Sequence, residues 1–214
     1  LNALDVMGNI ERFRGKKILV SSVTDPYHPI ESKYKLTRKI LEALIPAQPR
    51  IEILTKGRMV TRDIDLLQQY DDATVGVSIA TLNEKYVRLL EPLTASPRLR
   101  IDAIRLCKEA GLKTYVFLSP IFPFITEAEN IIELSKDHVD YFMFENLNVR
   151  PLNRKKIYNF LEENAPELLL KYKEIYESKD NRYWDNLKER MQGICDELGK
   201  EAKFYFHHGG FSEK

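Results

Sequence analysis

The fold is decided by the stretch Ile18-Leu19-Val20-Ser21-Ser22-Val23-Thr24-Asp25-Pro26-Tyr27-His28-Pro29-Ile30-Glu31. Its apolar start is typical of a buried parallel strand. The hydroxyl and carboxyl side chains that follow, with two prolines, end the strand and display polar groups. In α/β folds, binding sites are built at the carboxyl ends of strands. The polar residues of this stretch are therefore the first candidates for a functional site.

The same alternation of strand-like and helix-like runs continues along the chain. Strands are predicted at 17–23, 51–54, 73–79, 113–118, 139–144 and 203–206, and helices at 31–45, 64–67, 84–90, 98–110, 126–134, 153–160, 166–176 and 181–198. This order predicts parallel strands joined by right-handed crossovers. Polar residues end nearly every strand, which favours a barrel. No glycine-rich phosphate loop follows the first strand, which argues against a dinucleotide-binding Rossmann fold. Five or six strands are too few for a closed eight-stranded barrel, so a partial barrel is expected.

The composition is that of a globular protein, with 43% hydrophobic and 30% charged residues among 214. The net charge of +1 gives no global attraction to nucleic acid or to anionic membranes. No apolar run is long enough to span a membrane and no signal peptide is recognisable, so a cytoplasmic location without a membrane partner is expected. The chain starts with Leu1, which predicts that it begins inside a longer product. Its two cysteines, Cys107 and Cys195, are expected to be reduced and buried.

Short polar motifs follow the predicted strands in a specific order. They are Ser22-Val23-Thr24-Asp25-Pro26-Tyr27-His28-Pro29-Ile30-Glu31, Thr37-Arg38, Leu41-Glu42, Thr55-Lys56, Arg62-Asp63-Ile64-Asp65-Leu66-Leu67, Val77-Ser78-Ile79, Leu90-Glu91-Pro92, Ser96-Pro97-Arg98, Arg100-Ile101-Asp102-Ala103-Ile104, Glu109-Ala110-Gly111 and Ser119-Pro120-Ile121-Phe122-Pro123. Over residues 17–135 this series resembles the radical S-adenosylmethionine (SAM) enzymes of the spore photoproduct lyase-like, or DNA repair photolyase-like, group.

The resemblance implies an α/β fold, a partial (β/α)6 TIM-like barrel. Family members hold a [4Fe–4S] cluster in a Cys-x3-Cys-x2-Cys loop after the first strand and cleave SAM to a 5′-deoxyadenosyl radical. This chain has no such loop, and its first strand resembles the family's second. We therefore expect a barrel truncated at its first βα unit over residues 1–150. Residues 151–214 are expected to add carboxyl-terminal helices and a final strand packed on the same domain.

The resemblance also implies which residues contact the two ends of SAM. Thr24 and Asp25 would face the ammonium of the methionine moiety, and Lys56 would face its carboxylate. Ser119 and Pro120 would frame the adenosine. Two plainer interpretations remain open from the residues themselves: Asp25 could only cap the following turn, and Lys56 could be a solvated surface lysine.

Two further cofactor contacts follow from the same resemblance. Ser78 would lie near the SAM carboxylate or ribose, and Arg100 would pair with that carboxylate through its bidentate guanidinium. Alternatively, Ser78 could be a small polar core residue bonded to backbone. Arg100 could instead form an ion pair with Glu91 or Asp102.

The leading hypothesis is a radical SAM, lyase-like enzyme whose cluster loop is missing from this chain, so that the chain alone is inactive. A nucleic-acid substrate follows from the family resemblance only. The first alternative is a metal-dependent barrel hydrolase that uses Asp25, His28, Glu145 and His207 or His208. The second is a non-catalytic module whose helices after residue 150 bind a partner.

Overall fold

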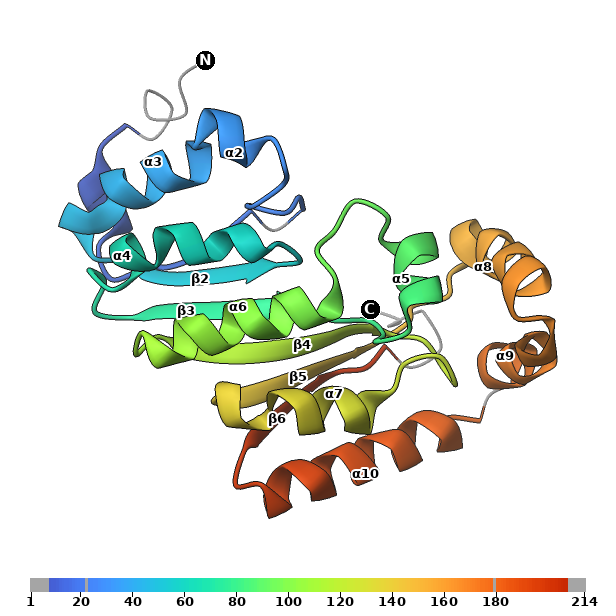
Figure 1. The fold of residues 1–214 in the computed structure, drawn as a ribbon. Coiled ribbons are helices and arrows are strands. Elements are labelled where there is room, and N and C mark those ends of the chain that lie inside the picture. The colour runs from blue at the N-terminus through green and yellow to red at the C-terminus, as the bar shows by residue number, and fades with distance from the viewer. Residues whose placement is uncertain (1–7, 22, 179, 208–214) are drawn as a thin grey trace.

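The computed structural model describes residues 8–21, 23–178 and 180–207. Its six strands form one sheet in their order along the chain, and all neighbours are parallel (Figure 1). They are β1 (Lys17–Val20), β2 (Arg50–Thr55), β3 (Ala73–Ser78), β4 (Lys113–Ile121), β5 (Tyr141–Asn146) and β6 (Glu201–Tyr205). β1 and β6 form the two edges, so the sheet is not closed. The predicted partial barrel is confirmed.

The helices supply the crossovers that parallel neighbours require. They are α2 (Glu31–Tyr34), α3 (Leu36–Leu44), α4 (Ile64–Leu67), α5 (Glu84–Leu90), α6 (Pro97–Glu109), α7 (Ala128–Ser135), α8 (Pro151–Asn164), α9 (Leu169–Glu177) and α10 (Arg182–Glu197). Short 3₁₀ turns are η1 (Ile10–Phe13), η2 (Ile45–Ala47), η3 (Arg58–Asp63), η4 (Lys136–His138) and η5 (Pro166–Leu168). In Figure 1, α3, α4, α6, α7 and α10 cover one face of the sheet, whereas α5, α8 and α9 lie beyond the carboxyl ends of the strands.

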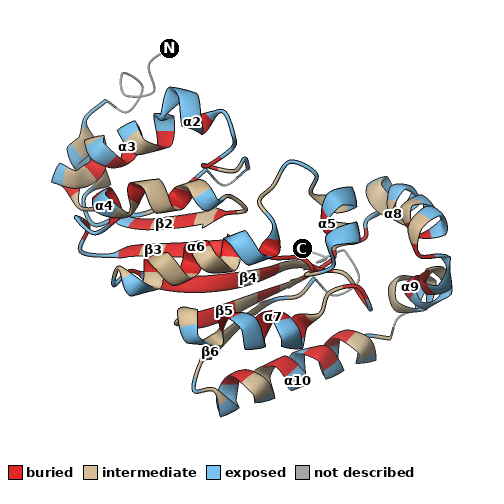
Figure 2. Cartoon of the chain, viewed as in Figure 1, coloured by how far each residue is buried: buried red, intermediate tan, exposed pale blue. Residues whose placement is uncertain are grey.

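Alternation along each strand separates the core from an open face. Side chains of successive strand residues point to opposite faces of a sheet. On β2, Ile51 and Ile53 belong to the main core with the helices, while the alternate residues Glu52 and Leu54 are only half-buried. Figure 2 shows the buried residues concentrated on the strands and on the helix sides turned toward them. The other face of the sheet bears no helix among the described residues in Figure 1, and it carries polar and aromatic side chains such as Glu52 and Tyr115.

A close contact between β3 and β4 on the open face of the sheet restricts which residue can occupy position 76. The Tyr115 ring on β4 lies over Gly76, where an added Cβ would be 2.2 Å from the ring carbon Cζ. The Tyr115 hydroxyl donates to Glu52 Oε1 at 3.0 Å, and its ring stacks on Tyr141 at 4.9 Å between centroids. Gly76 is therefore required because only a missing side chain leaves room for this ring.

The structure differs from the prediction of one continuous helix over 31–45. The chain breaks at Lys35, which has a left-handed φ of 49°. The buried carboxylate of Glu31 turns back to accept a hydrogen bond from the Leu36 backbone N–H at 2.7 Å, at the start of α3. A carboxylate at this place satisfies an otherwise unpaired amide of the first turn. The apolar periodicity from Leu36 to Leu44 predicted α3, but it could not reveal the break that separates α3 from α2.

The carboxyl-terminal region divides between two cores. β6 pairs with β5, and α10 buries Trp184, Leu187 and Met191 in the main core, as the predicted apolar stripe requires. α8 and α9 instead surround a second apolar cluster that includes Leu161 and Tyr172. Among the described residues, no helix combines the length and apolar character needed to cross a membrane.

Gly76→Ala tests the close approach between β3 and β4. The new methyl group would collide with the Tyr115 ring. We expect the free energy of unfolding in urea to fall by roughly 1–3 kcal/mol, as for other overpacked cores. The matched control is Gly193→Ala on α10, where nothing lies within 4 Å of the added Cβ. There the better helix propensity of alanine should stabilise the protein by up to about 1 kcal/mol. Equal stability of both variants would contradict the contact.

Candidate functional site

Asp25 ties the loop after β1 to the end of β2. Its Oδ1 accepts hydrogen bonds from the Tyr27 backbone N–H at 2.8 Å and from Thr55 Oγ1 at 2.6 Å. Its Oδ2 accepts from the Lys56 backbone N–H at 2.7 Å. The bond from the Tyr27 N–H is the turn cap that the sequence offered as the plainer interpretation of Asp25. The two bonds to β2 were not foreseen, because Thr55 looked like the ordinary end of a strand.

A buried ionic cluster anchors the far side of this loop. The fully buried carboxylate of Asp63 accepts from Arg62 Nη2 at 2.7 Å and from Arg38 Nη1 at 2.9 Å. The Tyr27 hydroxyl donates to Asp63 Oδ2 at 3.2 Å. Burial, with the nearby Asp63 charge, raises the pKa of Tyr27 far above its usual value, so the phenol stays neutral. Tyr27 is thus held from both ends, which fixes the path of residues 25–31.

Lys56 joins a chain of charges that reaches into the core. Its Nζ lies 3.2 Å from Glu91 Oε1, and Glu91 Oε2 lies 2.7 Å from Arg100 Nη2. The Lys56 side chain is 34% exposed, whereas the Arg100 side chain is completely buried. Of the partners expected for Arg100, the structure has Glu91. Lys56 is therefore neither a freely solvated lysine nor a buried one, and its ammonium stays accessible at the surface.

The remaining donors of Arg100 bind the ends of β3 and of the loop before α6. Nε donates to the Ala95 carbonyl at 2.8 Å, Nη1 to the Ser78 carbonyl at 2.7 Å and Nη2 to Thr94 Oγ1 at 2.5 Å. A buried guanidinium requires such extensive pairing because its desolvation is expensive. Ser78 Oγ in turn donates to the Ser119 carbonyl at 3.0 Å. This is the alternative that the sequence also allowed, a small polar residue bonded to backbone. Thr94 had no sequence signal.

A cavity of about 560 Å³ lies between these elements. Its lining includes Asp25 and His28 from the loop after β1, Lys56 from the end of β2, and Thr94 and Ala95 from the loop before α6. The cavity thus brings together two of the residues predicted as cofactor contacts. They carry opposite charges, a carboxylate and an ammonium, which complement the two charged ends of an α-amino-acid group. The volume is in the range of small-molecule sites.

A second polar cluster forms where β4, β5 and β6 end. Ser119 Oγ donates to Glu145 Oε2 at 2.5 Å, and His207 Nε2 lies 3.6 Å from Glu145 Oε1. Asn146 holds the His207 backbone through bonds of 2.7 and 3.1 Å. Pro120, next to Ser119, is half-buried. These side chains lie at the carboxyl ends of the strands, as the cavity does, but near β5 and β6 rather than near β1 and β2.

Thr24, another predicted cofactor residue, bonds within its own loop. It is exposed, and its Oγ1 shares a 2.8 Å hydrogen bond with Ser21 Oγ, three residues earlier. Ser21 itself has a left-handed φ of 61°. Thr24 therefore belongs to the turn that leads into Asp25, and its hydroxyl bonds within that turn.

The ligand set predicted for a metal-dependent hydrolase is not brought together. His28 is exposed in the loop after β1, whereas Glu145 lies on β5 and His207 follows β6, four and five strands away in the sheet. Within residues 8–21, 23–178 and 180–207, no three histidine, cysteine, aspartate or glutamate side chains converge on a point that could hold a metal ion. His208 lies outside the described residues. The Asp25 carboxylate is already bound by backbone and hydroxyl donors.

The cysteines do not fit an iron–sulfur cluster. Cys107 on α6 and Cys195 on α10 are both buried and free, as predicted. Burial raises the pKa of Cys107 to about 12 and that of Cys195 to about 11, so both remain thiols. Cluster ligation needs several thiolates at close spacing. No pair of closely spaced cysteines exists in the 214-residue sequence.

Comparison with known proteins agrees with this architecture. The sequence profile of the radical SAM superfamily matches residues 2–135. An uncharacterized protein of Methanocaldococcus jannaschii is 35% identical over 184 residues, which cover 84% of this chain and 70% of that protein.

Two solved structures share the fold. A mutant of spore photoproduct lyase superposes with a TM-score of 0.62 at 18% identity and covers 91% of this chain. The chain spans 62% of that lyase. SuiB of Streptococcus suis, bound to S-adenosylmethionine, superposes with a TM-score of 0.59 at 15% identity, and here the chain spans 39% of the enzyme. At these identities the likeness concerns the fold alone.

Arg100→Leu tests the buried guanidinium. Removing it leaves Glu91 Oε2 and two carbonyls without their arginine donor in the core. We expect the free energy of unfolding to fall by about 3–5 kcal/mol in a urea titration. Arg105→Leu, on the same helix but in exposed ion pairs with Asp102 and Glu109, is the matched control and should unfold close to the wild type. An Arg100→Leu protein as stable as its control would refute the role.

The cysteine thiols offer a second test. Because burial holds both as protonated thiols, neither should react with Ellman's reagent in the folded protein at about pH 8, where ordinary cysteines are partly ionised. Both should react at once in concentrated guanidinium chloride. Rapid labelling of either thiol in the native protein would show that its helix opens more readily than the structure indicates.

Proposed function

The chain belongs to the radical S-adenosylmethionine superfamily, and from this we propose that its cavity at the ends of β1 and β2 binds the methionine end of SAM in a lyase-like radical enzyme. One observation carries the proposal: Asp25 and Lys56, chosen from the sequence as contacts of opposite charge, line the same cavity. A SAM methionine group carries an ammonium and a carboxylate on one carbon, so it needs both charges within one small site.

In this proposal each charged residue has one task. Lys56 contacts the SAM carboxylate from the exposed end of its ion pair with Glu91. Asp25, with Thr24 beside it, accepts from the SAM ammonium with the lone pairs that its backbone and Thr55 bonds leave free. Arg100 does not touch SAM. It is a positioning residue that holds Glu91, and through Glu91 it holds Lys56.

The adenosine end of SAM is proposed to extend along the carboxyl ends of the strands toward β4. Ser78 and Ser119 connect the ends of β3 and β4 by a hydrogen bond, and Pro120 follows directly. Because the strands are parallel and follow one another in sequence order, these residues lie next to the cavity at the carboxyl ends of the strands. An extended ligand that starts at Asp25 and Lys56 would cross Ser78 before it reaches Ser119.

The iron–sulfur cluster supplies the electron that cleaves SAM in this superfamily. The residues of this chain do not fit such a cluster, since both cysteines are buried and distant in sequence. We propose that the cluster ligands are contributed from outside these residues and that the chain alone is inactive. The chain spans 62% of spore photoproduct lyase and 39% of SuiB, which is compatible with further parts.

The substrate is a separate question, because fold and cofactor site do not choose it. Spore photoproduct lyase has been solved with a dinucleoside spore photoproduct, and SuiB with its precursor peptide SuiA. A nucleic-acid substrate is proposed for this protein only through its likeness to the lyase. The metal-dependent hydrolase gains no support from the described side chains. A partner-docking role of α10 is weakened, because Trp184 is buried in the core.

The test uses the protein that contains this chain with all residues encoded before it. It is reconstituted anaerobically with iron and sulfide and then supplied with SAM and a reductant, and 5′-deoxyadenosine is quantified. We expect product from the wild type. Lys56→Met should raise KM for SAM by about tenfold to a hundredfold, because a hydrogen bond to a charged group contributes about 1.5–3 kcal/mol.

Lys39→Met is the matched control, because Lys39 is an exposed lysine on α3 and does not line the cavity. Its KM for SAM should stay at the wild-type value. Two results count against the proposal. One is a reconstituted wild type that shows iron–sulfur absorption but releases no 5′-deoxyadenosine. The other is a Lys56→Met variant with unchanged KM.

A further inference from the structure

A smaller cavity of about 290 Å³ lies among α5, α8 and α9, beyond the carboxyl ends of the strands (Figure 1). Aliphatic and aromatic side chains form most of its lining, among them Leu90, Phe122, Leu147, Ile157, Phe160 and Tyr172. Three of them come from different parts of the chain: the end of α5, the loop after β4 and the loop after β5. The cavity is thus apolar and built from separate elements.

Tyr172 in this lining has an unusual hydroxyl. The residue is completely buried, and its hydroxyl has no hydrogen-bond partner among the described residues. The other buried side-chain atom without a partner in the described part of the chain is Arg154 Nε on α8, which does not line the cavity. Leaving a buried donor unpaired is unfavourable, so such a group asks for an explanation.

The surrounding tyrosines show that this packing normally pairs its hydroxyls. Tyr176, one turn further along α9, donates to the Leu147 carbonyl at 2.9 Å. Tyr158 on α8 donates to Glu177 Oε1 at 3.0 Å. Tyr27 and Tyr115 in the main core also have carboxylate partners. Among the buried tyrosine hydroxyls of the described residues, that of Tyr172 is the one without a partner.

The chemical state of Tyr172 defines what could pair with it. Burial, with the nearby Tyr183 and Tyr86, raises the pKa of Tyr172 far above its usual value. The group is therefore a neutral phenol that donates one hydrogen bond. Asn153 at the rim does not compete for a ligand, because its amide already bonds the Asn148 carbonyl and the Arg150 backbone N–H. The lining is thus mainly apolar, with the exposed Lys156 at its rim and the enclosed Tyr172 hydroxyl as its buried unpaired donor.

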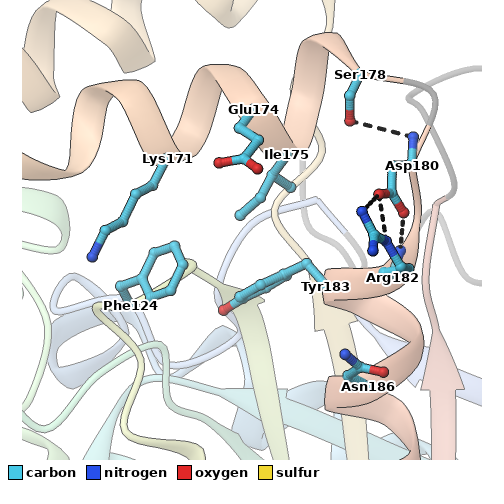
Figure 3. Close-up of a pocket in the computed structure, with 9 residues that line it drawn as sticks. All are labelled: Phe124, Lys171, Glu174, Ile175, Ser178, Asp180, Arg182, Tyr183 and Asn186. Carbon is cyan, nitrogen blue, oxygen red and sulfur yellow. Dashed lines mark hydrogen bonds and ion pairs between the residues drawn. The ribbon is translucent and has the colours of Figure 1, made fainter.

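A neighbouring cavity lacks this combination. It has a volume of about 400 Å³ and lies between α9 and the start of α10 (Figure 3). Figure 3 shows its Asp180 bonded to both Ser178 and Arg182, and the Lys171 ammonium stands 4.9 Å from the centre of the Phe124 ring. No lining side chain there is among the buried atoms without a partner in the described residues. It therefore defines no ligand chemistry.

We propose that the cavity among α5, α8 and α9 binds a small, neutral, mainly apolar molecule that carries one hydrogen-bond acceptor for the Tyr172 hydroxyl. The hydroxyl is closed off from solvent in the empty cavity, so the ligand reaches it when a lining side chain changes rotamer, as core side chains do. The proposal does not depend on SAM binding, because no residue of the cavity at β1 and β2 lines this one.

The test compares the binding of two ligands of the same shape to the wild type and to two tyrosine-to-phenylalanine variants. Acetophenone and α-methylstyrene differ only in a carbonyl oxygen exchanged for a methylene group. Dissociation constants of both are measured by NMR titration for the wild type, Tyr172→Phe and Tyr158→Phe. Comparing ratios of dissociation constants cancels the different hydration of the two ligands, as in a double-mutant cycle.

We expect the preference for acetophenone over α-methylstyrene to be roughly fivefold greater in the wild type than in Tyr172→Phe, which corresponds to one net hydrogen bond. Tyr158→Phe removes a hydroxyl outside the cavity and should keep the wild-type ratio. Free Tyr172→Phe should melt at or above the wild-type temperature, because an unpaired hydroxyl is removed.

Three results would overturn the proposal. The first is an equal ligand ratio in the wild type and Tyr172→Phe. The second is that neither compound shifts any resonance of α8 or α9. The third is a lower melting temperature of free Tyr172→Phe, which would mean that a trapped water already pairs the hydroxyl. None of these results bears on SAM cleavage, so failure here and failure of the proposed function are distinguishable.

Discussion

The buried guanidinium of Arg100 is the constraint on which the carboxyl edge of the sheet depends. A charge removed from water must be surrounded by acceptors, and the acceptors here are Ser78, Ala95, Thr94 and Glu91. They come from the end of β3 and from the loop between α5 and α6. Because this loop also lines the larger cavity, the shape of that cavity follows from a helix residue in the core.

Asp25 has the corresponding role on the other side of the cavity. It binds the end of β2 through Thr55 and the Lys56 backbone, so the loop after β1 cannot move independently of β2. The charged groups proposed for SAM are therefore held by hydrogen bonds that exist without any ligand. Such preorganisation lowers the entropy that binding must overcome. The same bonds explain why a capping function and a binding function of Asp25 do not exclude each other.

Much of this architecture could be predicted from the sequence, with defined failures. The strands were found because β-branched and aliphatic runs alternate with amphipathic helices. The break at Lys35 was missed because a left-handed residue other than glycine leaves no pattern in composition. The partner of Arg100 stayed open because Glu91 and Asp102 are both near it in sequence. Thr55 and Thr94 were missed because a threonine hydroxyl gains its role only from what the fold places beside it.

The sequence alone is sufficient for the order of the parallel strands and for the superfamily, because periodicity and motif order are local properties, although it misplaced the ends of β1 and β4. It also determined that cluster ligation cannot come from Cys107 and Cys195. Only the tertiary structure decided that Asp25 and Lys56 share one cavity and that Arg100 is buried behind Glu91. It alone revealed the unpaired hydroxyl of Tyr172. These facts depend on distances between segments far apart in the chain, which no local pattern encodes.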